Sequence, residues 1–383
     1  MKQTKIARFL IFIVIATFFG YRYYTLTNSL HLGALVLFFG LALLSFSPYF
    51  SSRWQTITLN IGITWLCLDL VFATIDMVEF AKALAQANYW ILIPSGIIVL
   101  VHLIVRTVRW QWLLKPMGEV AFWPAFRAMS IGLAGNIILP ARAGEFLRAY
   151  VLGRSTGLRK TGVFATLVVE RILDGLTVLV FLVVSIFFGT SNELIRQVAV
   201  AGFVVYMILL AGVVAFVLKR HWADMVINKL LPATWAKRLL ALLDGFSSGL
   251  DIIKDPRLLA YVSFLSLATW ILVPFSFWVA LLAFDFGVPI PWPTSFIMVP
   301  MVALGMTVIA TPGGVGPFQL AVTITLDATL SLSQRVPNYD EVAGASSIVV
   351  HVAQLLPQLA AGFVSFWVEG LSIEDWRKEE EGG

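Results

Sequence analysis

Charged residues and cysteine are both scarce in this sequence. Only 13% of its 383 residues are Asp, Glu, Lys or Arg, whereas 59% are hydrophobic and the mean hydropathy is +0.87. A soluble domain could not expose so much apolar surface to water. Cys67 is the only cysteine and lies within an apolar run, which excludes a disulfide framework and a cysteine-based metal site. We therefore expect an integral membrane protein.

Sequence motifs for nucleotide and metal chemistry are also missing. The chain has no GxxxxGKS or GxxxxGKT phosphate loop, no HExxH motif, no D-x-D pair and no cluster of metal ligands. The glycine-rich run PGGVG lies between apolar half-helices, where it indicates a break in a helix and not a nucleotide loop. We therefore expect no metal, no cofactor and no nucleic-acid partner.

Long apolar runs recur along the whole chain. Each is long enough to cross about 30 Å of hydrocarbon as a helix. The first run follows a basic start, as in a signal peptide, but no small-residue cleavage site follows it, which favours a retained helix. We expect eight spanning helices, at residues 6–24, 30–48, 57–75, 89–113, 163–189, 198–218, 258–283 and 344–368.

Two further apolar stretches, residues 125–152 and 295–330, are interrupted by Gly and Pro. The first interruption reads NIILPARAGE, and the second reads IATPGGVGPF, with Pro312, Gly313, Gly314 and Gly316. Each stretch predicts two half-helices that enter and leave the membrane by the same side, although a kinked spanning helix is an alternative for 125–152. The predicted fold is thus an all-α polytopic membrane helix bundle, with about eight spanning helices and two Gly/Pro-broken re-entrant hairpins of opposite orientation.

A faint repeat relates the two interrupted stretches. Five identities occur at a constant offset of 172 residues, where Ile137, Pro140, Gly144, Phe146 and Ala149 match Ile309, Pro312, Gly316, Phe318 and Ala321. An inverted pair of this kind brackets a midplane site in many transporters. Internal duplication and chance in so apolar a chain are both compatible with the sequence.

The distribution of Lys and Arg predicts the orientation. In this topology, 22 of the 27 basic residues lie on the side that holds the N-terminus. The positive-inside rule then places both termini in the cytoplasm and the protein in the cytoplasmic (inner) membrane. Residues 219–257 combine seven basic groups with apolar residues at helical spacing, which predicts an amphipathic connection on an anionic lipid surface. Residues 369–383 are expected to be a cytoplasmic tail.

Polar residues follow one face of the helix predicted at 163–189. Thr166, Glu170, Asp174 and Thr177 fall at i, i+4, i+8 and i+11. The stripe must face protein or water, and two carboxylates one turn apart each require a cation or a proton. We expect an intramembrane charge network that either pins the first hairpin or serves function, formed by Glu145, Glu170, Arg171 and Asp174.

Arg142 and Arg148 are our candidates for binding a lipid head group, together with Asn136. The planar guanidinium group suits phosphate, and the break that ends at Gly144 would leave free backbone groups beside it. Glu145 is expected to pair with Arg148, three residues on.

Other polar residues within apolar segments have plainer interpretations. Arg106, Arg109 and Trp110 end a membrane segment and are typical of anchors at the membrane interface. Asp69 is an isolated acid for which the sequence names no partner. The last predicted helix carries a polar stripe that is expected to make hydrogen bonds between helices, formed by His351, Gln354 and Gln358.

Several of these motifs together resemble a known family. The order RTVRW, NIILPARAGEFLRAYVL, a basic loop, ATLVVERILDGL and then ATPGGVGPFQ is similar to the flippase-like membrane region of lysylphosphatidylglycerol synthases. The resemblance covers about residues 57–368, which would form the flippase-like membrane domain, with residues 1–56 as two additional N-terminal transmembrane helices. It implies movement of a lipid with a polar head group across the cytoplasmic membrane.

The same family also limits what can be carried over. In the full synthases a soluble aminoacyl-transferase domain follows the membrane region, whereas this sequence ends fifteen residues after its last predicted helix. We therefore do not expect aminoacyl transfer here. The family also contains stand-alone membrane proteins, including archaeal relatives linked to dolichol-phosphate sugar pathways, so the identity of the lipid cannot be inherited.

Three classes of function follow. The leading one is flipping of a polar-headed lipid such as a phospholipid, an aminoacyl phospholipid or a polyprenyl-phosphate-linked sugar. The alternative is a membrane glycosyltransferase or other lipid-modifying enzyme that uses a polyprenyl phosphate donor, with Asp76 or Glu79 as a base, although short outer loops leave little room for an acceptor. The third is an accessory membrane protein without a substrate. A homo-oligomer is compatible with all three.

Overall fold

The structure is a computed structural model. Three predictions fall outside the residues that it describes: those on Pro140 and Arg142, those on almost all of the 219–257 connection, and those on the tail beyond Gly370. The described residues are 2–26, 29–47, 50–139, 143–188, 193, 196–197, 200–208, 255–308, 311–330 and 336–370.

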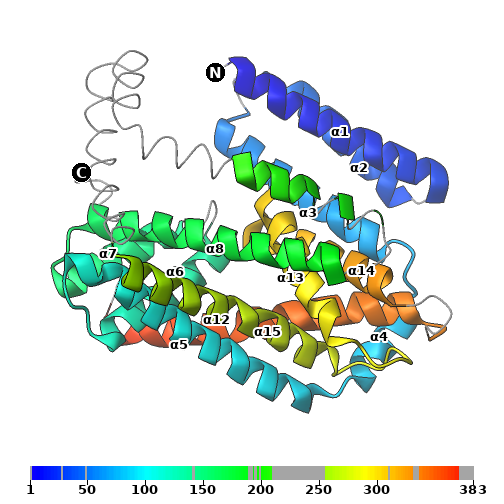
Figure 1. The fold of residues 1–383 in the computed structure, drawn as a ribbon. Coiled ribbons are helices and arrows are strands. Elements are labelled where there is room, and N and C mark those ends of the chain that lie inside the picture. Colours follow the sequence, from blue (N-terminus) through cyan, green and yellow to red (C-terminus); the bar gives the residue numbers. More distant parts are fainter. Residues whose placement is uncertain are drawn as a thin grey trace.

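Every regular element in these ranges is a helix (Figure 1). Where a helix begins in a polar segment, a side chain caps it: Ser51, Asp76 and Asp255 accept hydrogen bonds from backbone N–H groups of the first turn. The elements are α1 (Lys2–Leu26), α2 (Ser29–Leu44), α3 (Ser52–Phe72), α4 (Met77–Gln86), η1 (Tyr89–Ile91), α5 (Leu92–Leu114), η2 (Lys115–Met117), α6 (Phe122–Ile138), α7 (Gly144–Thr156), α8 (Lys160–Phe188), α12 (Pro256–Leu281), α13 (Trp292–Val308), η5 (Pro312–Gly314), α14 (Pro317–Thr329) and α15 (Tyr339–Val368).

The protein is an all-α membrane helix bundle, as the sequence predicted. Five helical stretches are long and apolar enough to cross a membrane: Ile6–Leu26, Trp54–Phe72, Tyr89–Met117, Pro256–Leu281 and Tyr339–Val368. A helix satisfies its backbone hydrogen bonds internally, which hydrocarbon requires of any spanning segment. α8 has 29 residues and carries its charged residues in the middle.

The second predicted span is shorter than expected. α2 has 16 residues and ends at Leu44, before the predicted end at residue 48. Ser45 contributes to this end, because its hydroxyl donates to the Ala42 carbonyl at 2.7 Å and so replaces a helical backbone bond.

Both Gly/Pro-interrupted stretches form two helices with a break between them. α6 and α7 pack side by side, and α13 and α14 do the same (Figure 1). Shifted by 172 residues along the chain, α6 and α7 would begin and end within two residues of α13 and α14. This agreement favours the internal repeat over chance. Re-entry of each hairpin from one side of the membrane stays a prediction.

Glycine brings the first pair of helices into backbone contact. A Cβ atom added at Gly144, the first residue of α7, would lie only 2.0 Å from the Gly132 carbonyl oxygen and 2.4 Å from the Asn136 nitrogen in α6. Gly135 faces the same contact, with Gly144 Cα 2.9 Å from the position of its added Cβ. Only glycine therefore allows α7 to start so close to α6.

The two breaks face each other in the interior. η5 packs against α6, and a Cβ added at Gly313 would lie 3.6 Å from the Ile137 carbonyl oxygen. On its other side the second break contacts α3, where a Cβ at Gly316 would lie 3.0 Å from the Thr64 carbonyl oxygen. Gly313, Gly314 and Gly316 all have positive φ, between 61° and 97°, a backbone conformation that favours glycine.

α1 and α2 pack against each other at one edge of the molecule, and α3 lies between them and the rest (Figure 1). Phe12, Phe19 and Phe38 form the centre of their shared core. Asp69 of α3 is not isolated as predicted, because its Oδ2 lies 2.7 Å from Arg22 Nε and its Oδ1 lies 2.6 Å from His31 Nε2. Its partners lie 47 and 38 residues away in the sequence, on α1 and α2.

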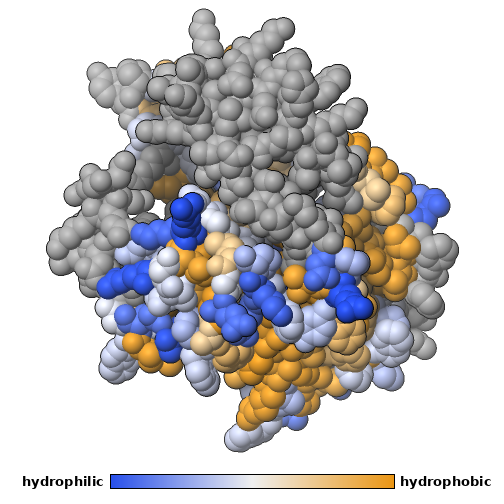
Figure 2. Space-filling model, turned by 60° about the vertical axis from the view of Figure 1, so that its left-hand side comes forward, coloured by the Kyte–Doolittle hydropathy of each residue, from blue (hydrophilic) through white to orange (hydrophobic). Residues whose placement is uncertain are grey.

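The two ends of the bundle differ in charge. The end formed by η2 and by the starts of α8 and α12 carries two exposed acids, Glu119 and Asp255, and more exposed basic residues: Lys115, Arg154, Arg159, Lys160 and Arg257. Figure 2 looks toward this side and shows hydrophilic side chains beside hydrophobic surface. The opposite end exposes Lys82 and three acids, Asp76, Asp285 and Asp340. The asymmetry agrees with the predicted orientation, which stays a prediction.

Candidate functional site

The polar stripe of α8 lies inside the bundle. Thr166, Glu170, Asp174 and Thr177 are between 0% and 7% exposed, so the helix turns this face toward other protein. Buried carboxylates are costly unless they are paired and hydrogen-bonded. Their partners come from two elements distant in the sequence, α5 and α7, and from α8 itself.

α5 supplies two of the cations. Arg106 Nε and Nη2 donate to Glu170 Oε1 at 3.0 and 2.7 Å. Arg109 is fully buried and donates through Nη1 to Asp174 Oδ1 at 2.7 Å and to Ser266 Oγ at 3.1 Å. Its Nη2 also lies 3.3 Å from Glu170 Oε1. Each arginine therefore joins α5 to the acids of α8.

The interpretation of Arg106, Arg109 and Trp110 as interface anchors is therefore wrong. The two arginines are three residues apart and the two acids four apart, so each pair occupies one face of its helix. The two faces meet when α5 packs on α8. The matched spacing was visible in the sequence, but the long separation along the chain concealed it.

Arg148 of α7 is buried against the same acids. Its Nη2 lies 2.9 Å from Glu170 Oε2, an ion pair whose angle falls outside hydrogen-bond geometry. Its guanidinium carbon lies 3.6 Å from the centre of the Trp110 ring, and Trp110 Nε1 donates to Thr166 Oγ1 at 3.0 Å. These contacts fasten α7 to α5 and α8.

Glu145 does not pair with Arg148, contrary to our expectation. Its Oε1 lies 3.4 Å from Arg171 Nε, because Arg148 turns toward the core while Glu145 turns toward α8. Arg171 Nη2 also donates to Glu170 Oε1 at 3.1 Å, and its Nη1 lies 3.5 Å from Asp174 Oδ2. The four residues predicted for the charge network are thus in mutual contact.

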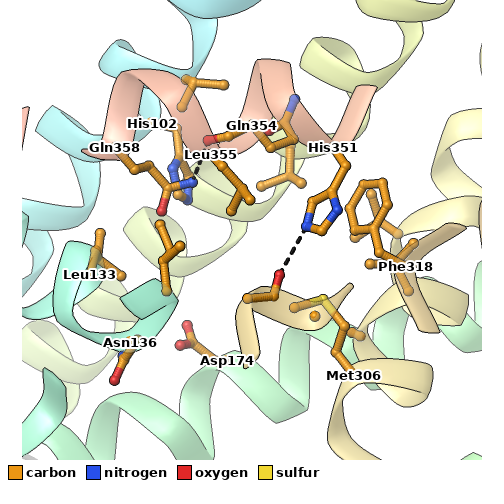
Figure 3. Close-up of a pocket in the computed structure, with 18 of the residues that line it drawn as sticks. His102, Leu133, Asn136, Asp174, Met306, Phe318, His351, Gln354, Leu355 and Gln358 are labelled. Atoms are coloured by element: carbon orange, nitrogen blue, oxygen red, sulfur yellow. Dashed lines mark hydrogen bonds between the residues drawn. The ribbon is translucent and has the colours of Figure 1, made fainter. Parts of the chain in front are cut away.

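A cavity of about 350 Å3 opens beside this network, where the two helix breaks meet (Figure 3). Its charged lining residues are Arg106, Glu145, Arg171 and Asp174. Arg148 and Arg109 lie behind them and do not line it. Asp174 is held by Trp270 as well, whose Nε1 donates to its Oδ1 at 2.9 Å.

Neutral polar groups line the rest of the cavity. α6 contributes Asn136, α5 contributes His102, and α15 contributes His351, Gln354 and Gln358, as Figure 3 shows. The predicted hydrogen bonds between helices are present, since Ser276 Oγ of α12 donates to Gln354 Oε1 at 3.1 Å. Two buried atoms of this lining, Asn136 Oδ1 and Gln354 Nε2, have no hydrogen-bond partner among the described residues.

The second break forms another wall of the cavity. Pro312, Gly313 and Gly314 line it, and the Gly313 carbonyl accepts a hydrogen bond from His351 Nε2 at 3.0 Å. Gly316, the fourth residue predicted for this break, lies outside the lining and contacts α3 instead. The break thus contributes backbone to the site.

Charge in this region is not balanced. The described cations of the network are Arg106, Arg109, Arg148 and Arg171, whereas its acids are Glu145, Glu170 and Asp174. One positive charge is therefore left over beside the cavity. In addition, α7 and α14 both begin at the breaks, so the positive ends of their helix dipoles point into the interior. The site is suited to an anion.

The two acids proposed as a catalytic base lie elsewhere. Asp76 caps α4, where its Oδ1 accepts from Val78 N at 2.7 Å, and Glu79 pairs with Lys82 at 2.6 Å. Neither lines the cavity. Among the described residues, no group of three or more His, Cys, Asp or Glu side chains is arranged to hold a metal ion.

Two curated proteins are similar to this chain. Glycosyltransferase AglD of Haloferax volcanii is 25% identical over 310 residues, which cover 72% of this chain and 49% of that protein. A UPF0104 membrane protein of Methanocaldococcus jannaschii is 31% identical over 120 residues, which cover 30% of this chain and 36% of that protein. The chain thus spans half or less of each of these relatives.

A family model matches much more of the chain. The matched residues, 57–362, begin within α3 and end within α15, so they contain both broken helix pairs, the charge network and the cavity. The match omits α1 and α2. On this match, the chain is a multi-pass membrane protein that belongs to the family of the lysylphosphatidylglycerol synthase TM region.

Proposed function

We propose that this protein moves a lipid with a phosphate-containing head group across the membrane. The head group would occupy the cavity at the meeting point of the two breaks, while the hydrocarbon chains stay in the bilayer. The observation that carries the proposal is the surplus positive charge beside a cavity built from two oppositely directed broken helix pairs. Broken helices of this kind surround the substrate sites of many transporters.

Arg171 and Arg106 are the cations that the cavity presents to a ligand. The Arg171 side chain is 38% exposed and Arg106 is 12% exposed, whereas Arg148 is 4% exposed and Arg109 is fully buried. A guanidinium group offers two parallel N–H donors to a phosphate. We therefore assign the main phosphate contact to Arg171, with Arg106 behind it.

The residues predicted for head-group binding have different positions. Asn136 lines the cavity with a free carbonyl oxygen, so it is suited to a hydroxyl or amine of the head group. Arg148 is held by Glu170 and Trp110 behind the cavity lining, and its direct contact with the lipid stays a prediction. Arg142 lies outside the described residues, and so its role stays a prediction too.

The test is transport by reconstituted protein. Arg171→Gln should lower the initial rate of translocation of a fluorescent anionic phospholipid at least about tenfold, the effect of losing one charged hydrogen bond of about 1.4 kcal/mol or more. The matched control is Lys82→Gln, which removes an exposed, acid-paired cation far from the cavity and should transport normally. Equal rates for Arg171→Gln and the parent protein would reject the assignment, and rates no higher than those of empty liposomes would reject transport of this lipid.

Sugar transfer from a polyprenyl phosphate donor is the second candidate. It is favoured by the name of the Haloferax volcanii relative, which is a glycosyltransferase. The structure gives Asp76 and Glu79 local roles at α4, so a base would have to come from Asp174 or Glu145 in the cavity. Altered lipid-linked sugars in Glu145→Gln, without a change in the sidedness of lipids, would favour this class. An accessory protein would instead tolerate Arg171→Gln in every assay.

A further inference from the structure

A chain of three hydrogen bonds ties the second break to α15. The Gly316 backbone N–H donates to Gln319 Oε1 at 2.8 Å, and Gln319 Nε2 lies 3.0 Å from His351 Nδ1. His351 Nε2 lies 3.0 Å from the Gly313 carbonyl oxygen, the contact that Figure 3 draws between α15 and the break. The chain therefore fastens both ends of the segment from Gly313 to Gly316.

The partners determine which atoms of His351 carry hydrogen. The Gly313 carbonyl can only accept, so His351 Nε2 must be protonated. The Gly316 N–H can only donate, so the Gln319 atom facing it is the oxygen, and the amide nitrogen faces the imidazole. That nitrogen can only donate, so His351 Nδ1 must be free of hydrogen. All three bonds coexist only when His351 is neutral.

We propose that His351 is a proton-binding site that opens the second break. A proton taken from cavity water onto Nδ1 would point an N–H group at the N–H groups of Gln319. Either the bond between His351 and Gln319 then breaks, or the amide turns over and the bond to Gly316 breaks. In both cases one end of the segment from Gly313 to Gly316 is released, and the wall that it forms can move.

The surroundings of His351 make this site responsive to an anion. The ring is 4% exposed, lines the cavity and stacks on Phe318 with 4.0 Å between ring centres. α12, α13 and α14 present neutral groups to the cavity, and its charged or titratable lining residues are His102 and Arg106 from α5, Glu145 from α7, and Arg171 and Asp174 from α8. The two arginines disfavour a further positive charge until an anion enters, so proton and anion favour each other. Coupling to lipid transport rests on the proposed function, whereas the proton site does not.

Motion of the break can be measured without any substrate. Val315 is 39% exposed and lies within the break, so a nitroxide spin label at Val315→Cys in a Cys67→Ala background reports on this segment. The mobile component of the spectrum should rise at least about fivefold between about pH 8 and about pH 4, a range that brackets the ordinary histidine pKa of about 6.5 and in which one buried hydrogen bond is lost. A label at Lys82→Cys on α4 should show no change.

Two histidine variants assign the effect. His351→Gln has no titrating ring and should abolish the change at Val315, whereas His102→Gln removes the other histidine of the same cavity and should leave it intact. A pH response that persists in His351→Gln, or is lost in His102→Gln, overturns the proposal, as does no response in the parent protein. Transport is measured separately as a function of pH. If no lipid is moved at any pH but the spectra behave as described, the proposed function fails and the proton site stands.

Discussion

Glu170 is the residue on which the charge network depends. It is fully buried, and it contacts all four arginines of the network, from α5, α7 and α8. Removing one partner of a buried ion pair leaves an uncompensated charge, whereas removing both partners together can be nearly neutral. The role of each arginine is therefore best separated by pairing its substitution with one at Glu170.

We expect Glu170→Gln alone to lower the free energy of unfolding by about 3–5 kcal/mol. Adding Arg148→Gln or Arg171→Gln should in each case recover at least about 0.5 kcal/mol relative to additive behaviour, because one unpaired cation is removed. Thermal unfolding in detergent measures both effects.

Transport distinguishes the two double variants. Arg148 lies behind the cavity lining, so the variant with Arg148→Gln should regain transport together with stability. Arg171 lines the cavity, so the variant with Arg171→Gln should regain stability alone. Unchanged stability of Glu170→Gln would refute the network, and transport by both double variants would refute the phosphate role of Arg171.

At the scale of elements, the first hairpin is defined by its glycines. α6 and α7 approach until Gly144 meets the backbone of Gly132 and Asn136, which places Asn136 and Glu145 at the cavity. Any side chain at Gly144 would separate the two helices at this point. The geometry of the site therefore depends on a residue that carries no functional group.

Gly144→Ala is expected to destabilise the protein by about 1–3 kcal/mol, the usual effect of overpacking, and to impair transport. The matched control is Gly40→Ala in α2, where an added Cβ has no atom within 4 Å and alanine favours the helix. Both variants are compared by thermal unfolding and by lipid translocation. If Gly144→Ala behaves like Gly40→Ala in both assays, the close approach of α6 and α7 does not hold the site.

At the scale of the whole molecule, the charge difference between the two ends favours one orientation. The end with Lys115, Arg154 and Arg159 is more basic than the end with Asp76 and Asp285. Because positively charged connections are retained in the cytoplasm, we propose that the basic end and both termini are cytoplasmic, in the cytoplasmic membrane. The anionic lipid surface predicted for residues 219–257 would then be the inner leaflet.

Single cysteines in a Cys67→Ala background test this orientation. Asp285→Cys should react with a membrane-impermeant maleimide on intact cells, whereas Arg159→Cys should react only after the membrane is permeabilised. Both residues are exposed, so neither outcome depends on burial. The reverse pattern would invert the topology, and reaction of both on intact cells would place the two ends on the same side.

The sequence by itself determined the class of fold and the positions of its interruptions. An apolar helix satisfies its own backbone, and Gly and Pro end it locally, so the helices and both breaks could be predicted from short windows. The acid stripe of α8 followed in the same way from helical spacing.

Only the tertiary structure decided which residues meet. Arg106 and Arg109 reach their acids across more than 60 residues, and Asp69 reaches Arg22 across 47, so no local pattern names these pairs. The rotation of each helix about its axis, which is set by packing, turned Arg148 into the core and left Arg171 facing the cavity. Packing likewise brought His351 within hydrogen-bond distance of a break that lies 38 residues earlier in the chain.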